Sequence, residues 1–317
     1  MSEPSMTNYP AGVTAIDAEF AGTKRLVASH LVVDAKEAAL VDVGSNFSVP
    51  LILRALERKK VARSQVRYVC VTHVHLDHAG GAGELMRQLP EATLVVHPRA
   101  ARHMIDPSGL YEGTKAIHGE RAMARDYGEL VPVPEPRIEV VNEGDRLPLG
   151  TRDLLFLDTP GHANHHYSIV DTSANVVFSG DTFGVSYRSL DTANGAFIFP
   201  STSPVHFDPQ AAHRSVERLR NLEPDAIYLA HFSQVTEIDR LADDLHRELE
   251  AYVDIAHRHR DAGDAQANAI AKDLVGRLTQ QLQAHGKEMS EQKVQQTLAL
   301  DLQMNTQGLQ VWLQRQA

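Results

Sequence analysis

Three histidines and one aspartate lie within a six-residue segment, at His73, His75, Asp77 and His78. Neutral imidazoles and a carboxylate suit a borderline transition metal such as zinc, iron or manganese. His73 and His75 are two residues apart, so in an extended segment their side chains point the same way. Asp77 and His78 follow where the chain turns, and they can face a second ion. The spacing therefore predicts two divalent metal ions, with zinc expected before iron or manganese.

A buried strand must hold this segment in place. The run Tyr68–Val71 directly precedes it, and its β-branched and aromatic residues predict a short strand that ends at the histidines. Gly80 and Gly81 follow the histidines, and we expect a helix from about Gly83 to Gln88. Further strands and helices alternate along the chain, which is typical of an α/β layered fold.

Other predicted strands also end at a single histidine or aspartate. Leu154–Leu157 is followed by a Pro-Gly turn and His162, Val176–Phe178 by Asp181, and the strand at 226–230 by His231. In α/β proteins such strand ends assemble a site at one edge of a sheet. We therefore interpret one metal as bound by His73, His75 and His162, the other by Asp77, His78 and His231, with Asp181 bridging the two.

The ordered motifs His73-x-His75-x-Asp77-His78, Gly161-His162, Gly180-Asp181 and His231 resemble the metallo-β-lactamase superfamily over residues 11–235. The resemblance implies a four-layer αββα sandwich with the metals at one edge of its two sheets, and it implies the same ligand assignment. Within the superfamily the chain resembles metal-dependent hydrolases of the glyoxalase II and lactonase type. It differs from true β-lactamases, because Asp181 stands where many of those have a cysteine ligand.

The 317 residues, 43% of them hydrophobic, suffice for a large core with an appendage. We expect a catalytic domain over residues 1–235. It carries an insertion at about 99–136, which either covers a cleft or is a surface excursion. Residues 236–317 are predicted to be all-helical, since Leu241, Leu245 and Leu249 recur at helical spacing. Their apolar faces must be buried, and we expect part of this region to wall the cleft and part to form a homodimer contact.

Charge and composition limit the partners of the protein. The net charge of -10 and the pI near 5.9 argue against binding to nucleic-acid phosphate. Cys70 is the single cysteine, so no disulfide framework is expected. Neither a signal-peptide segment nor a membrane-spanning apolar run is evident. We expect a cytoplasmic protein that acts on a small molecule and binds neither nucleic acid nor membrane.

Several further side chains are candidates for the surroundings of the metals. His165 and His166 follow His162 closely, and we consider them as substrate-facing residues or as supports for the ligands. Tyr187 and Arg188 could polarise or clamp a substrate oxygen, although an ordinary loop pair explains them too. Other candidates are Asp42, as a carboxylate behind the ligands or a turn residue, and His97 and His206 at loop edges. The remaining histidines on amphipathic helices, His246, His257, His259 and His285, are expected to be solvated.

The leading functional hypothesis is a binuclear metal-dependent hydrolase. Two divalent ions lower the pKa of a bridging water to about 7, and the resulting hydroxide attacks an ester, lactone or thioester carbonyl. Asp77 acts as ligand and as the residue that orients or shuttles the proton. One alternative is a di-iron redox protein that binds or reduces oxygen or nitric oxide. Another is a regulatory protein that retains the fold.

Overall fold

The computed structural model of the chain describes residues 3–316. These residues form two compact units. Unit 1 comprises the described residues up to Asp158 together with His165–Gly180 and Ile227–Gln234, and unit 2 comprises Thr159–Asn164, Asp181–Ala226 and the described residues from Val235 onward. The chain therefore passes between the units several times.

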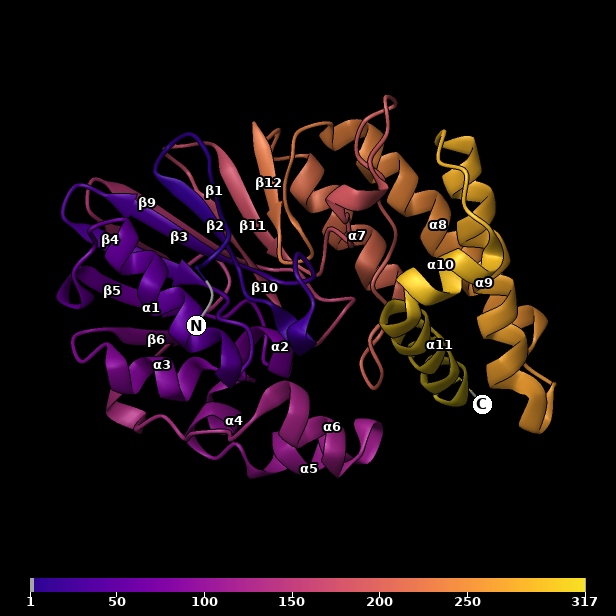
Figure 1. Cartoon of the computed structure of the whole chain (residues 1–317), viewed down its shortest axis with the longest axis horizontal. Coiled ribbons are helices and arrows are strands. Elements are labelled where there is room, and N and C mark those ends of the chain that lie inside the picture. Colours follow the sequence, from indigo (N-terminus) through magenta and orange to yellow (C-terminus); the bar gives the residue numbers. More distant parts are fainter. Residues whose placement is uncertain (1–2, 317) are drawn as a thin grey trace. The chain divides into compact units, whose positions relative to one another are not determined.

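Unit 1 is organised around two β-sheets (Figure 1). In the first, the strands follow chain order: β1 (Met6–Asn8), β2 (Val13–Asp17), β3 (Ala28–Asp34), β4 (Glu37–Val41), β5 (Val66–Cys70), β6 (Thr93–Val96) and β7 (Ile138–Val140). Pairing is antiparallel from β1 to β4 and parallel from β4 to β7. The second sheet has the order β13 (Ser233–Val235), β12 (Ala226–Leu229), β11 (Val176–Gly180), β10 (Tyr167–Asp171), β9 (Arg152–Asp158) and β8 (Arg146–Leu149).

Helices cover the first sheet because parallel strands require crossover connections. These are α1 (Val49–Arg58), the single turn α2 (Leu76–Ala79) and α3 (Ala82–Gln88). Ile52 and Leu56 of α1 and Leu85 of α3 share one buried cluster with Leu40 and Val69 of the strands. Burying each such side chain contributes about 1.5–3 kcal/mol. This packing fixes the strand end from which the histidine segment emerges.

Contacts between the sheets hold the two halves of unit 1 together. The Tyr167 hydroxyl of β10 donates a hydrogen bond to the Val95 carbonyl of β6 (2.9 Å). The buried ring of His30 on β3 lies 5.5 Å from the ring of Phe178 and 5.6 Å from that of Tyr228. The strand ends of both sheets in this unit are thereby held in a fixed relation.

The insertion is helical and packs beside the metal-binding segment. It contains α4 (Ala101–Ile105), α5 (Ser108–His118), α6 (Glu120–Ala122) and a π-helical turn at Met123–Tyr127. Met123 and Tyr127 are buried in one cluster with Phe20 and Leu76, and Leu76 directly precedes Asp77. This end of the insertion is therefore anchored next to the predicted ligands.

Unit 2 is dominated by helices, as predicted for residues 236–317. It contains α7 (Pro209–Arg220), α8 (Ile238–Arg258), α9 (Gln266–Ala284), α10 (Glu291–Thr297) and α11 (Ala299–Gln314) (Figure 1). Leu241, Leu245 and Leu249 of α8 are buried, as is Trp312 of α11. The division of the chain into residues 1–235 and 236–317 stays a prediction. Between residues 3 and 316, no helix has the length and apolar character needed to cross a membrane.

Some expectations about local structure were wrong. Strands β1, β2, β8 and β13 were not predicted; β1 and β13 have only three residues each, and β8 contains Pro148. A serine before a helix is a typical N-cap, which would predict this role for Ser48 before α1, but its hydroxyl donates to the Ala18 carbonyl (2.8 Å) and does not cap the helix.

The four histidines that were expected to be solvated, His246, His257, His259 and His285, are partly exposed, and each also has a specific neighbour in unit 2. The neighbours are Asp273 for His259 (2.9 Å), the Gly195 carbonyl for His285 (3.0 Å), the Trp312 ring for His257 (5.0 Å) and His213 for His246 (2.7 Å).

Candidate metal centre

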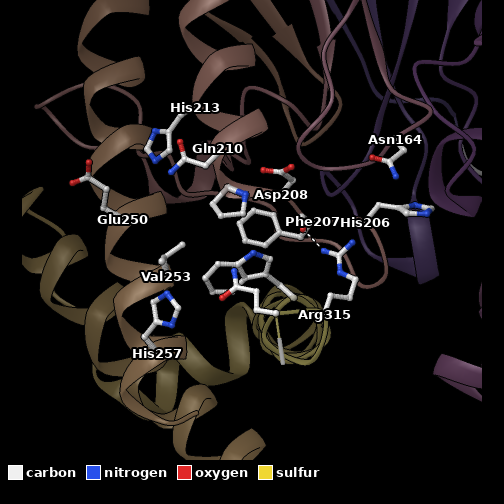
Figure 2. Close-up of a pocket in the computed structure, with 13 residues that line it drawn as sticks. Asn164, His206, Phe207, Asp208, Gln210, His213, Glu250, Val253, His257 and Arg315 are labelled. Atoms are coloured by element: carbon white, nitrogen blue, oxygen red, sulfur yellow. Dashed lines mark hydrogen bonds between the residues drawn. The ribbon is translucent and has the colours of Figure 1, made fainter.

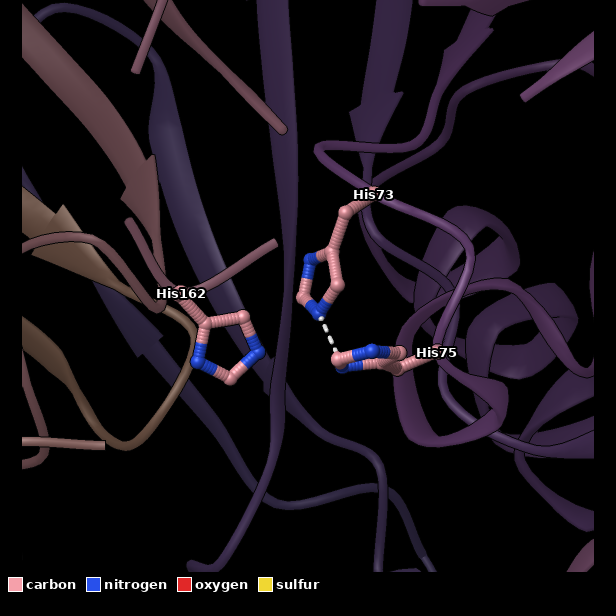
Figure 3. A group of neighbouring side chains, drawn as sticks. All are labelled: His73, His75 and His162. Carbon is pink, nitrogen blue, oxygen red and sulfur yellow. Dashed lines mark hydrogen bonds between the residues drawn. The ribbon is translucent and has the colours of Figure 1, made fainter. Parts of the chain in front are cut away.

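The loop after β5 carries four of the predicted ligands. His75 is the last residue before α2, so Asp77 and His78 lie in the first turn of that helix. His73 and His78 are completely buried. Nε2 of His73 lies 2.9 Å from Nδ1 of His75 (Figure 3), which confirms that these two side chains converge. Two ring nitrogens this close offer adjacent donor atoms for one cation.

A second group of donor atoms forms around Asp77 in unit 1. Oδ2 of Asp77 lies 3.5 Å from Nε2 of His78 and 3.5 Å from Nε2 of His231, which follows β12. Burial alone would raise the pKa of Asp77, but the neighbouring imidazoles outweigh it and hold that pKa well below its usual value. The carboxylate is therefore ionised and bracketed by two imidazoles, which is the donor chemistry of a transition-metal site.

Nδ1 of four predicted ligands lies at hydrogen-bond distance from an oxygen atom, which for His73 is the Thr72 hydroxyl (3.1 Å). For His231 this is the Leu26 carbonyl (2.7 Å), for His162 the Ser201 carbonyl (3.1 Å) and for His78 the Asp42 carboxylate (3.0 Å). A carbonyl oxygen can only accept, so Nδ1 donates, and loss of the Nε2 proton that faces the neighbouring carboxylate leaves Nε2 free to bind a metal. Metal-binding histidines are oriented in this way. The two carbonyl partners could not be identified from sequence, because a backbone oxygen has no residue type.

Asp42 forms hydrogen bonds with both Thr72, in the loop after β5, and His78 of helix α2. Its Oδ1 accepts from the Thr72 backbone amide (2.8 Å), and its Oδ2 lies near both the Thr72 hydroxyl (2.9 Å) and Nδ1 of His78 (3.0 Å). Asp42 is buried and adopts a φ of 52°, a left-handed conformation that Asp and Asn tolerate. Of the two roles considered for Asp42, the structure favours the support of a ligand.

Unit 2 carries the two remaining predicted ligands, and it places them together. Nε2 of His162 lies 3.4 Å from Oδ2 of Asp181, and the Ser201 hydroxyl donates to the same Oδ2 (3.4 Å). Gly161 has a φ of 131°, and a Cβ there would lie 2.4 Å from the backbone of Ala212 in α7. Only glycine therefore allows the His162 loop to approach α7 this closely.

The other candidate residues divide between the units. In unit 1, the ring centroid of His166 lies 4.9 Å from that of His73. The ring centroid of His165 lies 5.6 Å from that of His75, and both His165 and His166 are buried. In unit 2, the Tyr187 hydroxyl donates to Asp301 (2.9 Å) and Arg188 donates to Ser186. The substrate roles predicted for these four residues, and the assignment of seven ligands to two ions, stay predictions.

His97 and His206 also lie in different units. Nε2 of His97 lies 3.4 Å from Asp158 within unit 1, and burial lowers the pKa of His97 despite that carboxylate. His206 lines a pocket of about 920 Å³ in unit 2, together with Phe207 and Trp312 (Figure 2).

Several known proteins have sequences similar to part of this chain. A protein of Sulfurisphaera tokodaii, the metallo-beta-lactamase fold-containing protein ST1585, is 29% identical over 168 residues, which are 52% of this chain and 59% of that protein. Hydroxyacylglutathione hydrolase of Hahella chejuensis is 28% identical over 62% of this chain and 58% of its own length. The anaerobic nitric oxide reductase flavorubredoxin of Salmonella arizonae is 28% identical over 50% of this chain, but only 28% of its own length is matched.

The fold is found among solved structures as well. The metallo-beta-lactamase family protein TTHA1429 of Thermus thermophilus superposes with a TM-score of 0.62 at 18% identity, covering 99% of this chain and 92% of that one. The family model described as the metallo-beta-lactamase superfamily matches residues 22–231, which include every predicted ligand. Both results confirm the fold class predicted from the motifs. The chain belongs to the metallo-β-lactamase superfamily.

Proposed function

We propose that this protein is a binuclear metal-dependent hydrolase that cleaves an ester, lactone or thioester. The observation that carries the proposal is the donor group of Asp77, His78 and His231, with both histidines anchored through Nδ1. These atoms suit zinc first, and iron or manganese as alternatives. The similarity to hydroxyacylglutathione hydrolase supports a carbonyl substrate, since an acylglutathione is a thioester.

In the proposed mechanism, most of the site residues would hold the two metal ions, and Asp77 would also orient the water. Two divalent ions, when bound, would lower the pKa of water to about 7 and polarise the carbonyl of the substrate. His73, His75 and His162 would hold one ion, and Asp77, His78 and His231 the other, with Asp181 shared. Asp77 is ionised, so it can accept a hydrogen bond from the attacking water and fix its orientation.

The surroundings of the ligands suggest how a substrate could be held. His165 and His166 lie beside His73 and His75, where a polar substrate group would approach the ligands. Tyr187 and Arg188 remain weaker proposals, because both side chains already bind partners in unit 2. The acidic net charge fits a small-molecule substrate, and a homodimer remains our proposal for the assembly.

A second candidate function is redox chemistry at a di-iron centre. The similarity to flavorubredoxin favours it, because the same ligand types can bind iron. The matched region is a minor part of that protein, however, and the single Cys70 within these 317 residues cannot build a four-cysteine iron site. Hydrolysis therefore remains the better-supported proposal.

Replacing Asp181 by alanine tests the ligand assignment. We expect the D181A variant to bind fewer metal ions than the wild type and to lose most of its hydrolytic activity, because the shared carboxylate is gone. Metal content is measured by mass spectrometry after purification without added metal. The exposed Asp225 provides the control, since D225A removes an aspartate elsewhere in the chain. Full metal content and full activity in D181A would show that the assignment is wrong.

A further inference from the structure

Ser201 links the two predicted metal ligands of unit 2. Its backbone carbonyl accepts a hydrogen bond from Nδ1 of His162 (3.1 Å), and its hydroxyl donates to Oδ2 of Asp181 (3.4 Å). With Nδ1 engaged in this way, Nε2 is the nitrogen of His162 that can bind a metal, and it lies 3.4 Å from the same carboxylate oxygen. A displacement of Ser201 would therefore disturb both ligands at once.

A buried asparagine of helix α11 holds the backbone on both sides of Ser201. The amide nitrogen of Asn305 donates to the Pro200 carbonyl (3.2 Å), and its Oδ1 accepts from the Thr202 backbone amide (2.7 Å). The Thr202 hydroxyl lies 3.0 Å from Oδ1 and 3.0 Å from the backbone carbonyl of Asn305. A backbone amide only donates and a carbonyl only accepts, so this role needs a side chain with both functions, which a carboxamide provides.

Helix α11 packs closely on the same segment. Asn305 is 3% exposed and Thr202 is fully buried, so loss of their hydrogen bonds would leave polar groups without partners. Gly308 follows Asn305 by three residues and lies on the same face of the helix. A Cβ on Gly308 would lie 2.2 Å from the Thr202 carbonyl oxygen, so only glycine lets α11 approach the segment this closely.

We propose that Asn305 and Gly308 of α11 are positioning residues of the metal centre and act through Ser201. Ser201 in turn orients His162 and Asp181, as the hydrogen bonds of its carbonyl and hydroxyl show. This role rests on the metal ions of the proposed function and is independent of the reaction that they serve. Helix α11 then helps to build the metal centre, in addition to burying its own apolar side chains.

The zinc affinity of the full chain, measured by competition with a coloured chelator, tests this role. We expect N305A to bind at least one zinc ion about 10-fold more weakly than the wild type, the lower end of the range for loss of a supporting partner. G308A should weaken zinc binding too, because it keeps every hydrogen-bonding group but pushes Thr202 away from α11. Alanine is the better helix former, so a weaker helix would not explain this loss.

L309A is the matched control, because it removes a fully buried leucine from the same helix, four residues after Asn305. It should lower the urea midpoint of unfolding and leave the zinc affinity of the folded protein unchanged, since leucine cannot hydrogen-bond to residues 200–202. Cobalt-substituted protein gives a second readout, because the visible absorption of bound cobalt depends on the geometry of its ligands. N305A and G308A should alter this spectrum, whereas L309A should not.

T202V covers the case in which N305A does not fold. It removes only the hydroxyl that contacts Asn305, and it should also weaken zinc binding. Wild-type zinc affinity in the folded variants of Asn305, Gly308 and Thr202, or an equal loss in L309A, would overturn the positioning role alone. A wild type that binds no zinc would overturn the proposed function and this role together.

Discussion

Replacing one carboxylate oxygen of Asp42 by an amide nitrogen tests whether this residue orients His78 for metal binding. Replacing Asp42 by asparagine keeps the volume of the side chain and its tolerance of a left-handed backbone. The asparagine carbonyl can still accept from the Thr72 amide, now 2.8 Å from Oδ1. The amide nitrogen would then stand at Oδ2, which is 3.0 Å from Nδ1 of His78.

This substitution reverses the hydrogen bond to His78. An amide nitrogen only donates, so Nδ1 of a neutral His78 would have to accept and the proton would move to Nε2. Nε2 is the atom that lies 3.5 Å from Asp77, and once protonated it cannot bind a metal. Loss of such a supporting partner typically weakens metal binding by about 10–100-fold. That range corresponds to about 1.4–2.7 kcal/mol of binding free energy.

Competition with a coloured chelator at neutral pH measures the metal affinity of wild type and D42N. Urea unfolding in the presence of EDTA checks that both proteins are folded without metal. The control is D17N, because Asp17 is equally buried but accepts hydrogen bonds from the backbone amides of Glu19 and Arg25. Unchanged affinity in a folded D42N protein, or an equal loss in D17N, would refute the reasoning.

Two further predictions concern stability. Burial lowers the pKa of His30 from 6.5 to about 3, so the unfolded state takes up the proton first and stability falls as the pH drops below about 6.5. The H30F variant has no imidazole to protonate, so up to about 1.4 kcal/mol of this loss per pH unit should disappear. Its free energy of unfolding in urea should therefore depend less on pH between pH 7 and pH 5 than that of the wild type. Parallel curves of unfolding free energy against pH for the two proteins would contradict this prediction. Arg277 binds the fully buried Glu248 through two nitrogens, at 2.8 and 2.5 Å. R277A leaves this carboxylate buried without its partner and should destabilise the protein by about 3 kcal/mol, whereas the double variant R277A/E248Q should regain part of the lost stability. An R277A variant with the same urea midpoint as the wild type would contradict this prediction.

The sequence predicted the elements that have a strong local pattern. The run before His73 is continuously apolar and the leucines of α8 recur at helical spacing, and both formed the predicted elements with these residues buried. Short strands such as β1 and β13 lack such a pattern, because three residues cannot show a period and pairing with distant strands creates them.

In the candidate site, too, the sequence predicted some features and could not predict others. The sequence could single out the candidate ligands, because histidine and aspartate at this spacing have a specific chemistry, and the structure brings their donor atoms together in clusters. The oxygen atoms that orient them could not be predicted, since the Leu26 and Ser201 carbonyls are backbone atoms brought to His231 and His162 by the fold. The pairing of His213 with His246 was missed for a related reason. Each residue alone is an ordinary helix histidine, and only the packing of α7 on α8 joins their rings.

The proposed metal centre serves hydrolysis, and a substrate panel tests this directly. Purified metal-loaded protein is incubated with a panel of esters, lactones and thioesters under anoxic conditions without reductant, before and after removal of the metal with a chelator. A metal-dependent hydrolase should turn over at least one of these substrates, lose this activity on chelation and regain it when the metal is restored. Absence of any hydrolysis by the loaded protein, together with iron-dependent reduction of oxygen or nitric oxide, would contradict the proposed hydrolysis.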